Sequence, residues 1–139
     1  MTTEGQEQEG IRRRVLVVDD DPDSTSFLEV LLNGDGHDVR TARDGATALG
    51  VAAELRPDLV LLDLGLRPPD GFEVARELRR QERDERALLV ALTGYSGEEV
   101  RQRCRDAGFD GHLLKPIRDF QGFRAMVRTL ALSEAGRLF

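Results

Sequence analysis

Residues 14–23 read RVLVVDDDPD, an apolar run that ends in three adjacent aspartates, with a fourth aspartate two residues later. The run has no alternation of apolar and polar residues, which is typical of a parallel strand covered on both faces. Carboxylates crowded together repel one another and lose solvation energy when they are buried. The stretch therefore predicts a core strand whose end carries a concentrated negative charge.

Short apolar runs and segments with helical periodicity alternate along the rest of the chain. The expected strands cover residues 15–18, 39–42, 59–62, 87–92 and 112–114. Each is followed by an expected helix. The second helix is expected to begin near Asp44-Gly45 and to stop at Arg56-Pro57, and the apolar stripes of the other four include Phe27, Phe72, Val100 and Phe123. Strict alternation predicts a parallel sheet with right-handed crossovers and helices on both faces. We therefore expect an α/β fold, a single doubly wound five-stranded parallel sheet with five helices.

The composition is that of one acidic globular domain. The chain has 139 residues, a formal net charge of −6 and 40% hydrophobic residues. This charge disfavours a direct nucleic-acid partner or an anionic membrane surface. Cys104 is the only cysteine, which suits a reducing compartment, and residues 1–10 are too polar for a signal peptide, so we expect a cytoplasmic protein. Cys104 itself is expected in the core.

Polar residues at the ends of the expected strands are the candidates for chemistry. They are Asp19, Asp20 and Asp21 after the first strand, Asp63 after the third, Thr93 after the fourth and Lys115 after the fifth. In doubly wound sheets the ligand site lies at these carboxyl ends. If the strand order is 2-1-3-4-5, the first and third strands are neighbours, and the first acids lie beside Asp63. Neighbouring carboxylates stay ionised when a cation joins them, and Mg²⁺ prefers such oxygen ligands.

This arrangement suits phosphoryl transfer. A carboxylate at the position of Asp63 can attack phosphorus and form an acyl phosphate. Mg²⁺ then supplies one counter-charge, Lys115 a second, and the Thr93 hydroxyl a hydrogen bond to a phosphoryl oxygen.

Four stretches resemble the response-regulator receiver domain of two-component signalling. They read VLVVDDDPD at 15–23, LVLLDLGLRPPDGFEVARELR at 59–79, LVALTGY at 89–95 and GFDGHLLKPI at 108–117. The resemblance implies a chemotaxis-regulator-like receiver with a flavodoxin-like fold and strand order 2-1-3-4-5, of the type found alone or attached to hybrid histidine kinases. It would occupy residues 12–132, between a disordered tail at 1–11 and a C-terminal tail at 133–139.

The resemblance also implies roles for individual residues. Asp63 would be the phosphoacceptor and Asp20 a direct Mg²⁺ ligand, Asp19 would act through a metal-bound water, and the backbone carbonyl of Gly65 would complete the protein ligands. Lys115 would contact the phosphoryl group.

Two further expectations concern the fifth strand and its end. The bond before Pro116 is expected to be cis, which only proline permits at low cost. The family couples phosphorylation to the strand-four loop and to an aromatic residue three positions before the lysine. Here Thr93 is present, and His112 occupies the position where the family more often has Tyr or Phe.

The implied activity is that of a phosphoacceptor with self-catalysed phosphorylation and dephosphorylation, and not of a turnover enzyme. The donor would be a histidine kinase or phosphotransfer protein, and a downstream protein would bind the fourth helix, fifth strand and fifth helix. No direct nucleic-acid or membrane partner is expected, and dimerisation is left open.

Three alternatives stand beside this interpretation. A phosphatase of the haloacid-dehalogenase type would use Asp19 as its nucleophile, since residues 19–21 also fit its D-x-D motif. A receiver-fold interaction module would never be phosphorylated. Taken singly, the acids also suit helix caps, and Asp21, Asp23 and Ser24 are the candidates for the first helix.

Overall fold

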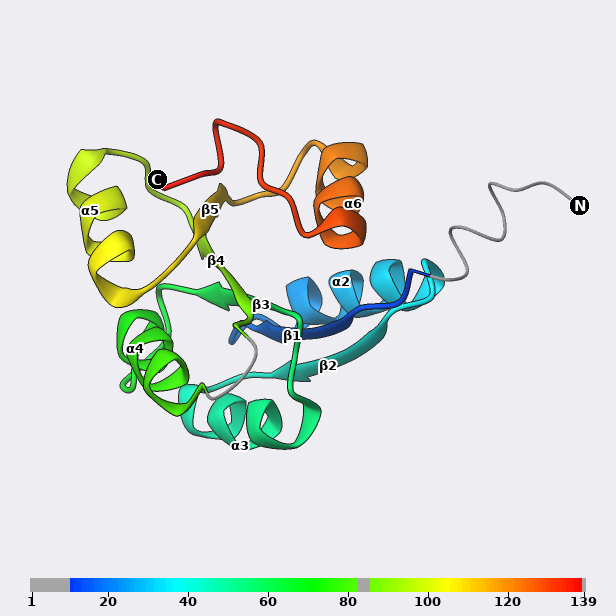
Figure 1. The fold of residues 1–139 in the computed structure, drawn as a ribbon, viewed down its shortest axis with the longest axis horizontal. Helices are drawn as coiled ribbons and strands as arrows, with labels where there is room; N and C mark the ends of the chain where they lie inside the picture. Colours follow the sequence, from blue (N-terminus) through cyan, green and yellow to red (C-terminus); the bar gives the residue numbers. More distant parts are fainter. Residues whose placement is uncertain (1–10, 83–85, 139) are drawn as a thin grey trace, which may run out of the picture.

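The fold is taken from a computed structural model, which describes residues 11–82 and 86–138. Within these residues five parallel strands form one sheet, as the sequence predicts, in the order β2-β1-β3-β4-β5 that the resemblance implies (Figure 1). The strands are β1 (Arg14–Val18), β2 (Asp38–Ala42), β3 (Leu59–Asp63), β4 (Leu88–Thr93) and β5 (Gly111–Leu114). The helices between and after them are α2 (Pro22–Gly34), α3 (Gly45–Leu55), α4 (Gly71–Gln81), α5 (Glu98–Ala107) and α6 (Phe120–Thr129).

Helices cover both faces of the sheet (Figure 1). In β1, Leu16 and Val18 pack against the layer of α3, α4 and α5, whereas Val15 and Val17 pack against α2 and α6. Successive residues of a strand point to opposite faces, so two covered faces require an apolar residue at every position. Cys104 is buried in the first of these layers, as expected. None of the described helices is long and apolar enough to cross a membrane.

The starts of the helices follow from their caps. Of the three candidates, Asp21 caps α2, and its carboxylate accepts a hydrogen bond from the backbone N–H of Asp23. Pro22 follows in the first turn, where its missing N–H costs nothing. Phe27 was expected in the apolar stripe, but it is 51% exposed and contacts Phe120 edge to face at the rim of α2 and α6. The stripe is therefore narrower than periodicity alone indicates.

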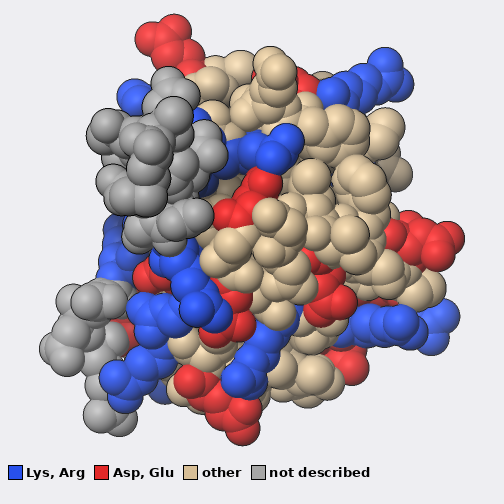
Figure 2. Space-filling view, turned by 90° about the vertical axis from the view of Figure 1, so that its right-hand side faces the viewer, with Lys and Arg blue, Asp and Glu red and all other residues tan. Residues whose placement is uncertain are grey.

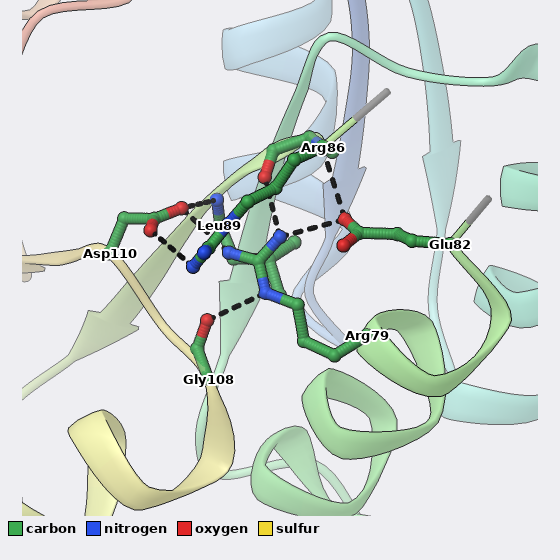
Figure 3. Close-up of polar contacts among 7 residues, drawn as sticks. Arg79, Glu82, Arg86, Leu89, Gly108 and Asp110 are labelled. Carbon is green, nitrogen blue, oxygen red and sulfur yellow. Dashed lines mark hydrogen bonds and ion pairs between the residues drawn. The ribbon is translucent and has the colours of Figure 1, made fainter. Parts of the chain in front are cut away.

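An arginine network joins the end of α4 to the amino ends of β4 and β5 (Figure 3). The guanidinium of Arg79 donates four hydrogen bonds, to two backbone carbonyls and two carboxylates. Its partners are Gly108, Ala87, Glu82 and Asp110. Asp110 also accepts hydrogen bonds from Arg86 and from the backbone N–H of Leu89. Both members of the Arg79–Asp110 pair are less than one fifth exposed, so the pair is shielded from water.

The two expected tails differ in what the structure describes. Residues 1–10 of the N-terminal tail lie outside the described residues. At the other end, residues 133–138 lie against the sheet: Arg137 forms an antiparallel bridge with Gly111 of β5, and Leu138 is 3% exposed. Residues 136–138 thus make backbone contacts with the edge of β5 that a free tail would not make.

Basic and acidic side chains are intermixed on the face drawn in Figure 2, around a broad uncharged area. Near neighbours of opposite sign partly cancel each other's field. This mixture is typical of a solvated protein face.

Candidate functional site

Three carboxylates gather at the carboxyl ends of β1 and β3. One oxygen atom from each of Asp19, Asp20 and Asp63 lies within 4.8 Å of the other two. The register explains the proximity, because Val18 pairs with Leu62 and the next residue of each chain segment is an aspartate. Asp19 and Asp63 are buried, whereas Asp20 is exposed to solvent. The cluster offers hard oxygen ligands with one side open, which fits a divalent cation such as Mg²⁺.

Lys115 brings a positive charge to this cluster from the end of β5. Its Nζ lies 2.8 Å from Oδ2 of Asp19 and 3.4 Å from Oδ1 of Asp63. Burial opposes the charge of Lys115, but the bonds and attraction to both aspartates outweigh it and raise its pKa. The bond from Lys115 to Pro116 is cis, as the resemblance implies. The sequence placed Lys115 near Asp63 but did not indicate that Asp19 would be its nearer partner.

Asp63 carries a charge that its surroundings do not fully compensate. Burial raises the pKa of Asp63, and the neighbouring charge of Asp19 raises it further, although the N–H of Gly65 and the charge of Lys115 oppose the rise. The backbone N–H of Gly65 donates a hydrogen bond of 3.0 Å to Oδ1 of Asp63. An added cation would relieve this imbalance.

Gly71, at the start of α4, is a residue of the site that the sequence reasoning missed. A Cβ built on Gly71 would lie 2.5 Å from the backbone carbonyl oxygen of Asp63 and 2.8 Å from Cα of Leu64. Only glycine allows the helix to start this close to the end of β3. Asp70 caps the same helix in a capping box with Glu73. The signal was present in the Asp-Gly pair, whose packing role needs the third dimension to be seen.

Thr93 and His112 lie outside the cluster of carboxylates. Thr93 is buried at the end of β4, and its hydroxyl oxygen accepts a hydrogen bond of 3.1 Å from the N–H of Tyr95. His112 is buried in β5, and within the described residues its Nδ1 has no hydrogen-bond partner. Burial lowers the pKa of His112, and the charge of Arg101 on α5 lowers it further. Within the described residues, neither the Thr93 nor the His112 side chain forms a hydrogen bond with Asp63.

The sequence and the fold match known proteins. A family model for the response regulator receiver domain matches residues 15–128. The DNA-binding dual master transcriptional regulator RpaA of Synechocystis sp. is 38% identical over 117 residues, which are 84% of this chain and 48% of RpaA. The DNA-binding response regulator MtrA of Mycolicibacterium smegmatis is 40% identical over 108 residues, 78% of this chain and 46% of MtrA.

A solved structure shares the fold at lower identity. The chemotaxis protein CheY4 of Vibrio cholerae superposes with a TM-score of 0.76 and 29% identity, over 83% of this chain and 96% of CheY4. In contrast, this chain spans about half the length of RpaA and MtrA.

Proposed function

Because this chain belongs to the response regulator receiver domain family of two-component signalling, we propose that Asp63 accepts a phosphoryl group from the phosphohistidine of a histidine kinase or phosphotransfer protein. The observation that carries the proposal is the position of Asp63, buried at the end of β3 beside Asp19, Asp20 and Lys115. A carboxylate oxygen of Asp63 forms the new bond to phosphorus. The bond from phosphorus to the imidazole nitrogen breaks, and its electron pair stays on that nitrogen.

Asp20 and Asp63 would hold Mg²⁺ directly, together with the backbone carbonyl of Gly65, and Asp19 would act through a bound water. The donor set supports this role, since all these groups are oxygen ligands and one carboxylate oxygen of each acid lies within 4.8 Å of the others. When bound, the ion supplies positive charge against the phosphoryl oxygens.

Lys115 and Thr93 would stabilise the product. The Nζ of Lys115 is 3.4 Å from Asp63, so a small movement brings it to an oxygen of the phosphoryl group. Thr93 would exchange its hydrogen bond with Tyr95 for one to the phosphoryl group, and the loop after β4 would follow. His112 is the second candidate switch residue, because it lies on β5 three residues before Lys115.

The output would pass through the face formed by α5, β5 and α6. We expect a downstream protein partner there, with dimerisation as a further use of the same face, and no direct contact with nucleic acid or membrane. The cytoplasm suits a partner histidine kinase, whose phosphohistidine must reach Asp63. Dephosphorylation would be self-catalysed within the same site, by attack of water on the acyl phosphate.

The test is phosphorylation by a small donor. The chain is incubated with acetyl phosphate and Mg²⁺, and the intact mass is measured before and after treatment with hydroxylamine, which cleaves acyl phosphates. The native chain is expected to gain one phosphoryl group, and Asp63→Asn to gain none. Asp21→Asn is the matched control, because Asp21 caps α2 and asparagine is an equally good cap.

Two results would contradict the proposal. Labelling that persists in Asp63→Asn but disappears in Asp19→Asn favours the haloacid-dehalogenase mechanism. A native chain that stays unlabelled by acetyl phosphate and by a histidine kinase, with Mg²⁺ in excess, favours an interaction module that is never phosphorylated.

A further inference from the structure

β5 is an edge strand of the sheet, and the last described residues of the chain cover its outer side. β5 pairs with β4 on one side, and residues 131–138, here called the C-terminal clasp, lie along the other (Figure 1). The backbone N–H of His112 donates to the carbonyl of Gly136 (2.9 Å), and that of Leu138 donates to the carbonyl of Asp110 (3.2 Å). An uncovered edge strand presents such groups to any other extended chain. The clasp therefore occupies a position where another strand could pair.

Side chains of α5 and the core hold the clasp in place. Leu138 is 3% exposed and belongs to the core layer on the α5 side of the sheet. Arg101 donates to the carbonyl of Arg137 (3.0 Å), and Arg105 donates to the carbonyl of Leu138 (3.2 Å). These contacts tie the last residues of the clasp to the face that the proposed function assigns to output.

The β5 residue beneath the clasp has no side chain. A Cβ built on Gly111 would lie 2.7 Å from both Cδ atoms of Leu132 and 2.8 Å from the carbonyl oxygen of Gly136. Glycine at position 111 thus allows the clasp to approach the strand directly. Larger residues at this position would displace it.

The attachment is nonetheless limited in extent. The pairing is a single antiparallel bridge, between Gly111 and Arg137. Beside the clasp, a hollow of about 490 Å³ lies between it, the end of β5 and α6, and its lining includes Leu113, Ile117 and Met126. Five clasp residues, Ala131, Ser133, Glu134, Ala135 and Arg137, are exposed to solvent, and a segment with few buried side chains opens more readily than the core.

We propose that the C-terminal clasp is a displaceable cover of the β5 edge, and that a partner protein which pairs an extended segment with β5 binds only after the clasp has left. The partner segment would run antiparallel to β5, with an apolar side chain in the place of Leu138. The identification of this edge as an output surface rests on the proposed function. The displacement itself does not require phosphorylation.

Hydrogen exchange of backbone amides, followed by NMR on the full chain, tests the clasp. In the native chain the amide of His112 is expected to exchange about tenfold or more faster than the amide of Val17 in β1, because the clasp opens without unfolding the sheet. In Leu138→Ala the His112 amide exchanges roughly tenfold faster again, while Val17 is unchanged. Glu134→Gln is the matched control, since Glu134 is an exposed residue of the clasp.

A second arm tests competition for the edge. A synthetic peptide of residues 130–138 is expected to shift the amide signals of Gly111 and His112 in Leu138→Asp but not in the native chain at equal concentration. If Leu138→Asp does not fold, Leu138→Ala takes its place.

Two results would contradict the proposal that the clasp is displaceable. One is exchange of His112 only at the rate of Val17, in the native chain and in Leu138→Ala, which would make residues 131–138 a fixed part of the fold. The other is binding of the peptide to native and variant chains alike. Neither arm uses a phosphodonor, so failure here leaves the labelling of Asp63 as a separate result.

Discussion

Asp63→Asn is expected to stabilise the fold in the absence of divalent cations, although it removes a charged group from the centre of the site. The folded-state pKa of Asp63 is raised above its ordinary value. A raised acid pKa means that ionisation costs more in the folded chain than in the unfolded chain, so stability is lost as the pH rises through that pKa. At neutral pH the native chain bears this cost, and asparagine removes it. The amide oxygen of the substituted side chain would still accept the hydrogen bond that Gly65 donates.

The effect is the balance of opposing interactions. With an effective dielectric constant of about 20, two unit charges 4.8 Å apart, the limit for Asp19 and Asp63, interact by roughly 3.5 kcal/mol. The attraction of Lys115 at 3.4 Å is roughly 5 kcal/mol on the same scale. Burial of the Asp63 carboxylate adds a desolvation cost, and with this cost the ionised form of Asp63 is disfavoured in the folded chain. The raised pKa fixes the sign of the net cost, and we expect it to have the usual size of a single-substitution effect, about 1–2 kcal/mol, or a rise in Tm of roughly 3–8 °C.

Thermal unfolding followed by circular dichroism, with EDTA and then with Mg²⁺, measures this effect. With EDTA, Asp63→Asn is expected to unfold at the higher temperature. Free Mg²⁺ at ten times its Kd stabilises a chain that binds it by about 1.4 kcal/mol. The native chain should gain most of this, and Asp63→Asn little or none. Addition of Mg²⁺ therefore narrows or reverses the difference between the two proteins.

The same chemical change elsewhere is the control. Asp44 caps α3, its carboxylate accepts from the N–H of Thr47, and that bond lowers the pKa of Asp44. Asp44→Asn should leave the Tm unchanged or slightly lower, and its response to Mg²⁺ should equal that of the native chain. A lower Tm for Asp63→Asn with EDTA, or an equal Mg²⁺ response in native and Asp63→Asn chains, would refute the reasoning.

Three further predictions concern parts of the fold outside the cluster of carboxylates. Arg79→Met should lower the free energy of unfolding in urea by about 1–3 kcal/mol, because it leaves the carbonyls of Gly108 and Ala87 without their donor and removes one of the two cations beside Asp110, whereas Arg80→Met on the solvent side should leave the midpoint unchanged. Burial lowers the pKa values of His37 and His112, so the unfolded chain binds protons first and the urea midpoint should fall as the pH drops below about 6.5; a midpoint that is flat or rises would contradict this. Burial raises the pKa of Cys104 to about 11, so a thiol reagent at mildly alkaline pH should react at the rate of unfolding, and fast reaction in the native chain would count against the burial.

The sequence predicts the sheet and the cluster well because both depend on local patterns. Continuous apolar runs mark strands covered on both faces, and the position of a residue just after such a run places it at the carboxyl edge. Asp19 and Asp63 come together through this rule alone, once β1 and β3 are neighbours.

Other features depend on contacts between distant segments, which periodicity does not encode. The stripe of α2 indicates a buried face but does not decide whether Phe27 lies within it or at its rim. Arg79 belongs to a charged run of the kind that usually faces solvent, yet its partners come from other segments of the chain. The residues after α6 read LALSEAGRL at 130–138, a short mixture of apolar and polar residues whose pattern does not indicate that Leu138 would reach the core.

The ammonium group beside Asp19 and Asp63 is also chemically unique, since Lys115 is the only lysine in the sequence and the other 19 of the 20 Lys and Arg residues are arginine. Reductive methylation with ¹³C-formaldehyde keeps the charge of a lysine and leaves arginine unmodified. One such treatment would install a single side-chain reporter within hydrogen-bonding reach of the acids, resolved from the chain's α-amino group by its shift. Metal and donor titrations could then be read at one resonance, without substituting any residue of the protein.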